Sequence, residues 1–459
     1  MKSVNKLLVV ALALVMVFSL AACKGGGDTA AAPDNGDAVE SQPPAEDPGD
    51  AGDAAAPVTI HLFSNLPDRA SGMGELEQTL IDSYMAENPN VTIEVEALQD
   101  EPYKQKFQSY VAGNSLPDIC MVWGQPSFFQ AVMEGGYVAE LNPDDYADYG
   151  FFAGSTADFS YDGTLYGLPR NQDLLSIIYY NKAIFDEYGV KVPETYDELL
   201  TAVETFQAND VIPLSINGKD KWILNEMFQD LLVKVSGNQD TIYDAVDQKT
   251  NFSTDPDIRK AAELYKGLVD AGLFQDSYIS ADYGAAMNLF LQEESAMFYM
   301  GAWEVGMASN EENSEHFREN VDVMAFPVVG DGKGKATDLL AWNGGGFAVS
   351  ASSPVKDEAT KLLNYMMTPD HWAKIGWETG NVVPGQDYSS FLTGNENQLQ
   401  LTITEFLQNA TSMSGTPWND YAPGEWKTNC EQIMQEYSAG IIDIDEFLSA
   451  LDEAAASNE

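Results

Sequence analysis

The fold class is indicated by residues 58–95, which read VTIHLFSNLPDRASGMGELEQTLIDSYMAENPNVTIEV. The first part, 58–64, is rich in residues that favour β-structure. Apolar residues then recur at helical spacing over 75–86, and residues 91–95 alternate between apolar and polar. The order strand, helix, strand is typical of a βαβ unit, in which the helix connects two parallel strands and covers the sheet.

The alternation continues along the chain. A helix is predicted through Tyr103, Phe107 and Tyr110, then a strand over 118–123 and a helix over 128–133. Strands that alternate with single helices predict a mostly parallel sheet covered on both faces. We therefore expect the first lobe to be α/β.

A second set of elements follows Pro169. The residues Thr195-Tyr196-Asp197-Glu198 form a predicted capping box that opens a helix. Further strands are predicted over 176–180, 211–216, 296–300, 321–327 and 347–350, and further helices over 257–271 and 283–292. No repeat of fixed period is visible, which argues against a solenoid.

Composition excludes several classes of protein. The chain has 459 residues, 44% of them hydrophobic, so it has enough apolar mass for one large or two medium cores and is not disordered as a whole. It carries 72 acidic against 23 basic residues, a formal net charge of -49. A cationic surface for nucleic acid or anionic lipid is therefore not expected.

The N-terminus predicts export. Lys2 and Lys6 precede an apolar run over 7–18, which is typical of a signal peptide and too short for a stable membrane span. We assign residues 1–22 to this peptide. The ending Leu20-Ala21-Ala22-Cys23 resembles a bacterial lipobox, which implies cleavage before Cys23 and its diacylation; the alternative is an ordinary cleavage site with a chance cysteine.

A polar tether is expected between Cys23 and the folded part. Residues 24–57 are rich in Ala, Gly, Pro and Asp and show no periodicity. Residues 23–57 are thus predicted to be a lipidated cysteine followed by a disordered acidic linker. The two other cysteines, Cys120 and Cys430, are expected to be buried and unpaired, although their sequence separation leaves a disulfide open.

Several motifs in a characteristic order resemble a known family. They are the lipobox, the opening unit 58–95, Leu116-Pro117-Asp118-Ile119, the turn Tyr166-Gly167-Leu168-Pro169 leading to Tyr180-Asn181-Lys182, the strand ending in Gly301-Ala302-Trp303, and Gly344-Gly345-Gly346-Phe347. In this order they resemble the extracellular solute-binding proteins of family 1, the maltose-binding-protein-like receptors of ATP-driven importers. The resemblance covers essentially residues 58–459.

The resemblance implies a two-lobed periplasmic-binding-protein-like α/β fold with a ligand cleft between the lobes. Lobe 1 would comprise 58–170 and about 345–380, and lobe 2 would comprise 171–344 and about 381–459. Hinge segments are expected near 169–172, 342–345 and 380–384. The implied protein is a monomeric, lipid-anchored receptor on the outer face of the bacterial cell membrane, which delivers a carbohydrate to permease subunits of an ABC importer. No cofactor, metal or nucleic acid is implied.

Candidate ligand-binding residues combine residue chemistry with family position. Sugar hydroxyls need directional donors and acceptors, and the C–H faces of sugar rings need aromatic surfaces. The aromatic candidates, placed by the resemblance, are Trp123, Trp303, Trp418 and Trp426. The polar candidates are Asn65, Gln125, Arg170, Gln172, Asp173, Glu304 and Asn343.

Three other functions remain open from the residues. The same fold could bind a cationic solute such as a polyamine or peptide, because acidic clefts with aromatic walls suit ammonium groups. A secreted glycoside hydrolase needs only a suitable pair of carboxyl groups, but no pair stands out among the 72 acids, and no nucleophile elbow or P-loop is present. A surface adhesin or scaffold whose lobes never close is the third alternative.

Overall fold

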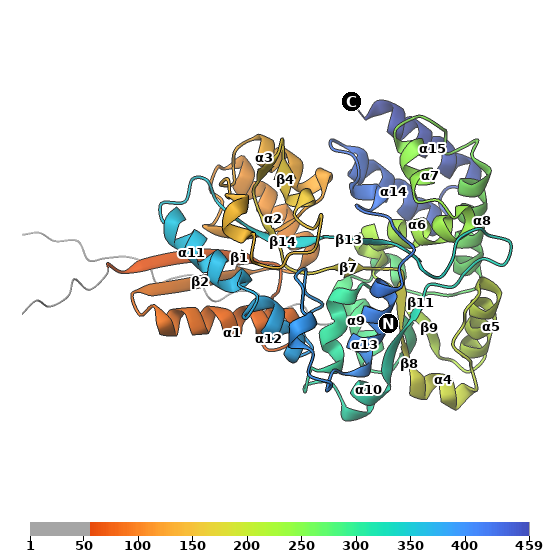
Figure 1. The fold of residues 1–459 in the computed structure, drawn as a ribbon. Helices are drawn as coiled ribbons and strands as arrows, with labels where there is room; N and C mark the ends of the chain where they lie inside the picture. Colours follow the sequence, from red (N-terminus) through yellow and green to blue (C-terminus); the bar gives the residue numbers. More distant parts are fainter. Residues whose placement is uncertain (1–55, 459) are drawn as a thin grey trace, which may run out of the picture. The chain divides into compact units, whose positions relative to one another are not determined.

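The computed structural model describes residues 56–458, whose hydrophobic core is divided into two clusters. We call the part of the chain around the cluster that contains Ile60 lobe 1, and the part around the cluster that contains Leu174 lobe 2 (Figure 1). The predicted signal peptide 1–22, the lipidated Cys23 and nearly all of the linker 23–57 lie outside the described residues.

Lobe 1 is built on a five-stranded sheet in the order β2-β1-β3-β14-β6. These strands are β1 (Val58–Ser64), β2 (Val91–Ala97), β3 (Ile119–Trp123), β6 (Leu168–Pro169) and β14 (Gly345–Val349). The helices of this lobe are α1 (Gly72–Glu87), α2 (Asp100–Ala112), α3 (Ala131–Glu134), α11 (Lys356–Met367) and α12 (Trp372–Glu378). A π-helical turn, η1 (Pro126–Gln130), and a small hairpin, β4 (Ser160–Tyr161) with β5 (Thr164–Leu165), complete it.

The prediction of a mostly parallel sheet is wrong for half of the strand pairings in the five-stranded sheet of lobe 1. Strand β1 pairs in parallel with β2 and β3, as expected for βαβ units. Strand β14, however, is antiparallel to both β3 and β6. The chain reaches β14 after passing through lobe 2 and not through a single crossover helix, so the rule that makes βαβ strands parallel does not apply to it.

Lobe 2 is built on a four-stranded mixed sheet in the order β11-β8-β10-β9. Its strands are β8 (Ile177–Asn181), β9 (Ile212–Ser215), β10 (Ser295–Phe298) and β11 (Val321–Ala325). Its helices are α4 (Lys182–Tyr188), α5 (Tyr196–Gln207), α6 (Trp222–Ser236), α7 (Asp240–Val246), α8 (Pro256–Asp270), α9 (Tyr283–Leu291), α10 (Glu315–Asn320), α13 (Gln398–Gln408), α14 (Trp426–Ser438) and α15 (Ile444–Ser457). The predicted capping box at Thr195 is confirmed at the start of α5.

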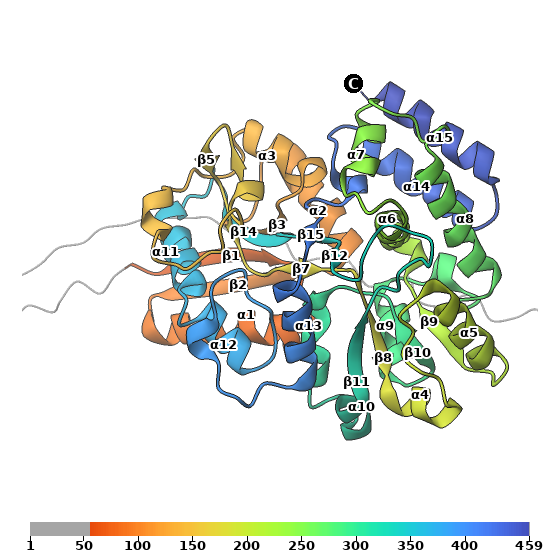
Figure 2. The ribbon, with the colours of Figure 1, turned by 45° about the vertical axis from the view of Figure 1, so that its right-hand side comes forward.

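Helix α6 forms the centre of lobe 2, and every one of its residues is buried. It packs against α7, α8 and α14, and Figure 2 shows it surrounded by these helices. Two of its buried charged groups have partners within the fold: Asp230 accepts a hydrogen bond of 2.8 Å from the Tyr299 hydroxyl, and Lys234 donates one of 3.1 Å to the carbonyl of Lys335. These polar partners let a helix with a mixed sequence lie in the core.

Three segments connect the two lobes and lie side by side. Membership of the two core clusters changes between Leu168 and Leu174, within 342–347, and between residues 382 and 383. Strand β7 (Asp173–Leu174) pairs with β13 (Ala341–Trp342), and the backbone N–H of Gln172 donates to the carbonyl of Val383 over 3.1 Å. The remaining short pair in lobe 2 is β12 (Asp338–Leu339) with β15 (Ser412–Met413).

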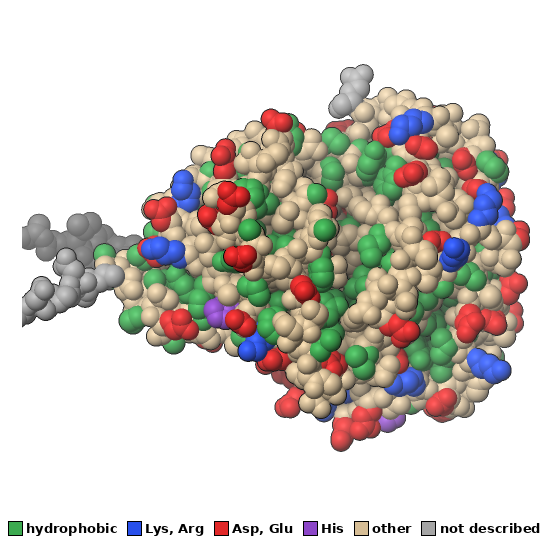
Figure 3. All heavy atoms as spheres, in the orientation of Figure 1, with side chains coloured by type: hydrophobic (Ala, Val, Ile, Leu, Met, Phe, Trp, Pro, Cys, Tyr) green, Lys and Arg blue, Asp and Glu red, His purple; other side chains and the backbone are tan. Residues whose placement is uncertain are grey.

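Other features of the described part concern cysteines, surface and membrane. Cys120 and Cys430 are both buried and free, and they belong to the cores of different lobes. Acidic side chains are spread over the visible face of both lobes (Figure 3). Between residues 56 and 458, no helix combines the length and the apolar character needed to cross a membrane.

Candidate functional site

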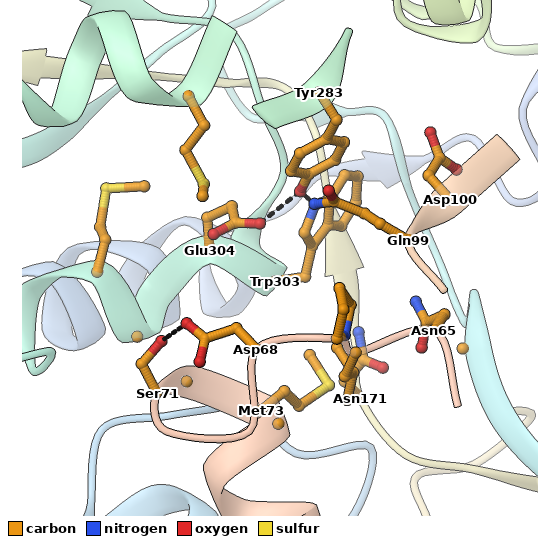
Figure 4. A pocket seen from close by; sticks show the side chains of 18 of the residues that line it. Asn65, Asp68, Ser71, Met73, Gln99, Asp100, Asn171, Tyr283, Trp303 and Glu304 are labelled. Carbon is orange, nitrogen blue, oxygen red and sulfur yellow. Dashed lines mark hydrogen bonds between the residues drawn. The ribbon is translucent and has the colours of Figure 1, made fainter. Parts of the chain in front are cut away.

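A cavity of about 580 Å³ lies between the lobes and is lined by residues of both. Lobe 1 contributes the loop that follows β1, the start of α1 and the residues around the ends of β2 and β3. Lobe 2 contributes α6, α9 and the 3-10 helix η6 (Ala302–Ala308). The volume is in the range of small-molecule sites, and Figure 4 shows polar and aromatic side chains facing one another across it.

Three tryptophans form the aromatic wall of lobe 2. The ring centroids of Trp222 and Trp303 are 6.1 Å apart, and those of Trp303 and Trp342 are also 6.1 Å apart. The indole Nε1 of Trp303 donates a hydrogen bond of 2.7 Å to the Tyr283 hydroxyl, which in turn donates to Glu304 (Figure 4). The Nε1 of Trp342 is buried and has no partner within residues 56–458. The wall therefore offers flat apolar surface together with an unused donor.

The facing wall belongs to lobe 1 and includes Trp123, the last residue of β3. Its ring packs edge-on against Phe128, with centroids 5.2 Å apart, and the Lys104 ammonium lies 5.2 Å from its centroid. Asp68 and Ser71 lie in the loop before α1, where the Ser71 hydroxyl donates to Asp68 over 2.5 Å (Figure 4). Both walls thus combine aromatic rings with hydrogen-bonding groups.

The floor of the cavity lies at the crossing segments and is buried and polar. Arg170 donates to the side-chain oxygens of Asn65, at 3.0 Å, and Asn171, at 3.2 Å. Its guanidinium carbon lies 5.7 Å from the ring centroid of Phe347. Burial raises the pKa of Asp173 to about 7, although Arg170 and a hydrogen bond from Asn171 oppose the shift. Arg170 therefore holds amide groups in place and forms no ion pair within residues 56–458.

Two hydrogen bonds join the lobes beside the cavity. The indole Nε1 of Trp222 in α6 donates to the Asp100 carboxylate in α2 over 2.8 Å, and the Ser127 hydroxyl in η1 donates to Asp420 in η8 (Trp418–Asp420). Lys104 forms an ion pair of 2.9 Å with Asp100. Burial disfavours the charge of this lysine, but Asp100 and a second neighbouring acid hold the pKa of Lys104 well above its usual value. Residues from both lobes therefore meet beside the cavity through polar contacts.

Comparison with known proteins identifies the family. The family model described as bacterial extracellular solute-binding protein matches residues 67–371, which is more than half of the chain. This protein belongs to that family. The match includes every strand of the lobe 1 sheet except β1, most of lobe 2 and most of the residues that line the cavity.

Some relatives of this solute-binding protein have names or titles that mention a carbohydrate. The multiple sugar-binding protein of Streptococcus mutans is 26% identical over 322 residues, which are 68% of this chain and 71% of that protein. A solved structure from work on xylan utilization by the thermophilic bacterium Caldanaerobius polysaccharolyticus has 26% identity and a TM-score of 0.78, and the alignment covers 86% of this chain and 99% of that chain. A chitin oligosaccharide binding protein has 21% identity and a TM-score of 0.77, with 88% of this chain and 99% of that chain covered. These structures show the same two-lobed fold.

The structure brings seven of the residues predicted for the site of this solute-binding protein to the cavity. They are Asn65, Trp123, Gln125, Arg170, Asp173, Trp303 and Glu304. Gln172 and Asn343 do not line it, although both are in or next to the crossing segments. The backbone of Gln172 bonds to that of Val383 in another crossing segment.

The structure contradicts a cavity position for Trp418 and Trp426. Both are completely buried in the core of lobe 2, with ring centroids 5.7 Å apart. The indole Nε1 of Trp418 donates to the carbonyl of Asn225 over 2.9 Å, and that of Trp426 donates to the carbonyl of Trp418 over 2.8 Å. Because their rings are packed and their donors are satisfied, these tryptophans stabilise the lobe and leave nothing for a ligand.

Several lining residues of the solute-binding protein are absent from the predicted set. They are chiefly Asp68, Ser71, Gln99, Asp100, Asn171, Glu226, Tyr283 and Trp342. A positional signal exists for some of them, because Asp100 begins α2 and follows β2 closely, and Tyr283 begins α9. Ligands in α/β proteins bind beyond the carboxyl ends of strands. No local signal exists for Glu226, which lies within a buried helix.

Proposed function

We propose that this protein is an extracytoplasmic receptor that binds a neutral oligosaccharide in the cavity between its lobes. The observation that carries the proposal is the pair of facing aromatic walls, with Trp222, Trp303 and Trp342 on lobe 2 and Trp123 on lobe 1. Sugar rings present apolar faces to such walls and hydroxyls at their edges. Amide, hydroxyl and carboxyl groups between the walls provide the directional partners that those hydroxyls require.

Binding would hold the lobes closed. Ligand groups that contact both walls at once stabilise the arrangement in which the walls are close, and the three crossing segments are the places where the backbone can bend. The sugar-binding name of the Streptococcus mutans relative supports the ligand class. In the proposal, the closed form is what the permease of an ABC importer recognises, and the sugar is released intact.

The proposal includes attachment to the outer face of the cell membrane through Cys23. It is supported by the lipobox-like sequence and by the extracellular character of the family. Metabolic labelling with palmitate tests it in cells that express the full chain. Label should be present in the wild-type chain and absent from Cys23→Ala; label that persists in the variant would contradict anchoring at this residue.

A cationic solute is the second candidate, because carboxyl groups of both lobes line the cavity. Asp68 from lobe 1 and Glu304 from lobe 2 both line it, and no lysine or arginine forms an ion pair with either among the described residues. A ligand ammonium group could bind between such acids and the tryptophans. The neutral sugar is favoured because Glu304 and Asp68 already accept hydrogen bonds from neutral hydroxyls, and burial raises the pKa of Glu304.

The test is a thermal-unfolding screen of the purified full-length chain against neutral xylo- and chito-oligosaccharides and against spermidine, each at low and high salt. A bound sugar should raise the unfolding temperature equally at both salt concentrations, whereas a bound polyamine should lose its effect at high salt. Stabilisation by spermidine alone would refute the sugar proposal. Recovery of cleaved sugar after hours at stoichiometric concentration would instead indicate a hydrolase.

A variant pair locates the site. Trp303→Ala removes the central ring of the aromatic wall and should weaken sugar binding at least tenfold. Tyr161→Ala removes an exposed aromatic residue that does not line the cavity, and it should bind as the wild type does. Equal affinities for the two variants would show that the sugar binds elsewhere.

A further inference from the structure

Glu226 differs from the other buried acids of the cavity in having no hydrogen-bond partner. It lies on α6, one turn after Trp222, is only 2% exposed and lines the cavity. Its Oε2 is completely buried and without a partner, and neither of its oxygens is hydrogen-bonded within residues 56–458. An unpaired buried carboxyl group costs free energy in the empty protein, so its presence at a cavity wall calls for a ligand group that pairs with it.

The comparison with neighbouring acids makes this specific. Asp100 accepts a hydrogen bond from Trp222, Glu304 accepts one from Tyr283, and Asp420 accepts one from Ser127. Asp420 is buried, whereas Asp100 and Glu304 are partly buried, and all three have hydrogen-bond partners within the protein. Asp173, another buried acid of the cavity, accepts a hydrogen bond from Asn171. Glu226 differs from these acids because its carboxyl group has no hydrogen-bond partner among the described residues and is available to a ligand.

The charged groups that face Glu226 come from three elements. They are Lys104 of α2, Asp420 of η8, and Lys427 and Glu431 of α14. The two lysines are already paired: Lys104 with Asp100 at 2.9 Å, and Lys427 with Asp420 at 2.6 Å and with Glu431 at 3.3 Å. Burial is the largest influence on Glu226 and raises its pKa well above the usual range, with Asp420 acting in the same direction.

These surroundings define the chemistry of a matching ligand group. A protonated carboxyl group has one donor and free acceptor capacity, and a sugar hydroxyl offers the same combination. A ligand ammonium group would require the ionised form and would approach close to two lysines. A hydroxyl group therefore fits the position better than a cation does.

We propose that Glu226 is a specificity-determining ligand residue, whose carboxyl group exchanges hydrogen bonds with a hydroxyl of the sugar ring that packs on Trp222. This inference rests on the proposed function, because it takes the ligand of the cavity to be an oligosaccharide. It adds a polar contact at the α6 end of the aromatic wall. A sugar that lacks a hydroxyl at that end should leave the carboxyl group unpaired and bind more weakly.

The experiment compares Glu226→Gln, Glu226→Leu and the control Glu431→Gln by calorimetric titration of the full-length chain. The probe is the xylo- or chito-oligosaccharide that stabilises the wild type. Glu226→Gln keeps a hydrogen-bond donor and an acceptor without charge, so its affinity for the sugar should stay within about threefold of the wild type. Glu226→Leu has neither group, so its affinity should fall roughly tenfold or more. Glu431 is buried in the same cluster but does not line the cavity, so Glu431→Gln should bind normally.

Thermal unfolding of the ligand-free variants separates binding from folding. Glu226→Leu removes an unpaired buried carboxyl group and should unfold at a higher temperature than the wild type, while binding sugar more weakly. If Glu226→Leu does not fold, the comparison of Glu226→Gln with the wild type still decides whether ligand binding needs a charged carboxylate at this position. Wild-type affinity in the Leu variant would overturn the role of Glu226. If Glu226→Gln loses as much affinity as Glu226→Leu does, the assignment of the ligand group to a hydroxyl is overturned and a cationic ligand group is indicated.

Failure of this inference is distinguishable from failure of the proposed function. If the wild-type chain binds none of the sugars and binds spermidine, the proposed function is wrong and the hydroxyl assignment falls with it. If the wild type binds sugar and Glu226→Leu binds it equally well, the receptor function stands and only the role of Glu226 is refuted.

Discussion

Trp222→Phe tests whether the two lobes are held together across the cavity. The indole Nε1 of Trp222 on α6 donates a hydrogen bond of 2.8 Å to the Asp100 carboxylate on α2, and these helices belong to different lobes. Phenylalanine keeps an aromatic ring at the cavity wall and removes the donor. The substitution therefore breaks one of the two hydrogen bonds that join the lobes beside the cavity.

The magnitude follows from the type of bond and from what remains after its loss. A hydrogen bond to a charged partner contributes about 1.5–3 kcal/mol net. Asp100 keeps Lys104 at 2.9 Å and is not left unpaired, so the lower end of that range applies. About 1.5 kcal/mol corresponds to roughly a tenfold change in an equilibrium constant. We expect the ligand-free chain to shift toward the open form by this factor, and the affinity for sugar to fall by up to the same factor.

Small-angle scattering of the ligand-free full-length chain measures the separation of the lobes, and calorimetric titration measures the affinity. The matched control is Trp418→Phe, which removes an indole donor that bonds to the carbonyl of Asn225 over 2.9 Å inside lobe 2. This control should lower the free energy of unfolding by about 1 kcal/mol and leave scattering and affinity unchanged. The reasoning is refuted if Trp222→Phe matches the wild type in both measurements, or if the control shifts them equally.

Three further predictions concern the crossing segments. Burial raises the pKa of Asp173 to about 7 from its ordinary 3.8. Between these two pH values the folded chain keeps a proton on Asp173 that the unfolded chain has lost, so the free energy of unfolding should fall by up to roughly 4 kcal/mol as the pH rises from the lower value to the higher one. Asp173→Asn should remove that slope in urea unfolding measured at several pH values; an unchanged slope would contradict the assignment. A Cβ on Gly344 would overlap Oδ2 of Asp173 and lie 2.6 Å from Nε1 of Trp342, so Gly344→Ala should lower the free energy of unfolding by about 1–3 kcal/mol. Gly330→Ala has no atom within 4 Å of its Cβ and should be nearly neutral in the same assay. Trp342→Phe removes an indole donor without a partner among the described residues, so it should weaken sugar binding by roughly threefold to tenfold with little effect on unfolding; equal affinity would show that this donor does not contact the ligand.

Elements with strong local signals could be predicted from the sequence. The strand predicted over 58–64 coincides with β1, and the capping box at Thr195 opens α5 as expected. Both depend on near neighbours in the chain, namely side-chain alternation and a reciprocal hydrogen bond within one turn. Helix α6 has no comparable signal, because it is buried on all sides and its residues Asp230 and Lys234 find partners far away in the sequence.

The tryptophans show why the site was predicted only in part. Trp303 and Trp418 both lie near the start of a 3-10 helix in a loop-rich stretch, yet one lines the cavity and the other is buried in the core. The difference comes from distant residues: Phe228 and Phe252 pack against Trp418, whereas Tyr283 holds the indole of Trp303 at the cavity wall. No property of the local sequence distinguishes the two.

The sequence by itself determined the α/β class, most strands of the two main sheets, some of the helices and the family resemblance, because periodicity, capping and motif order are properties of neighbouring residues. Only the tertiary structure decided that β14 runs antiparallel to β3, that Trp222 and Trp342 join Trp303 in one wall, and that Glu226 is buried without a partner. Each of these depends on which residues the folded chain brings together across long separations. These long-range contacts decide which side chains are buried and which have hydrogen-bond partners, and the chemistry of the cavity follows from both.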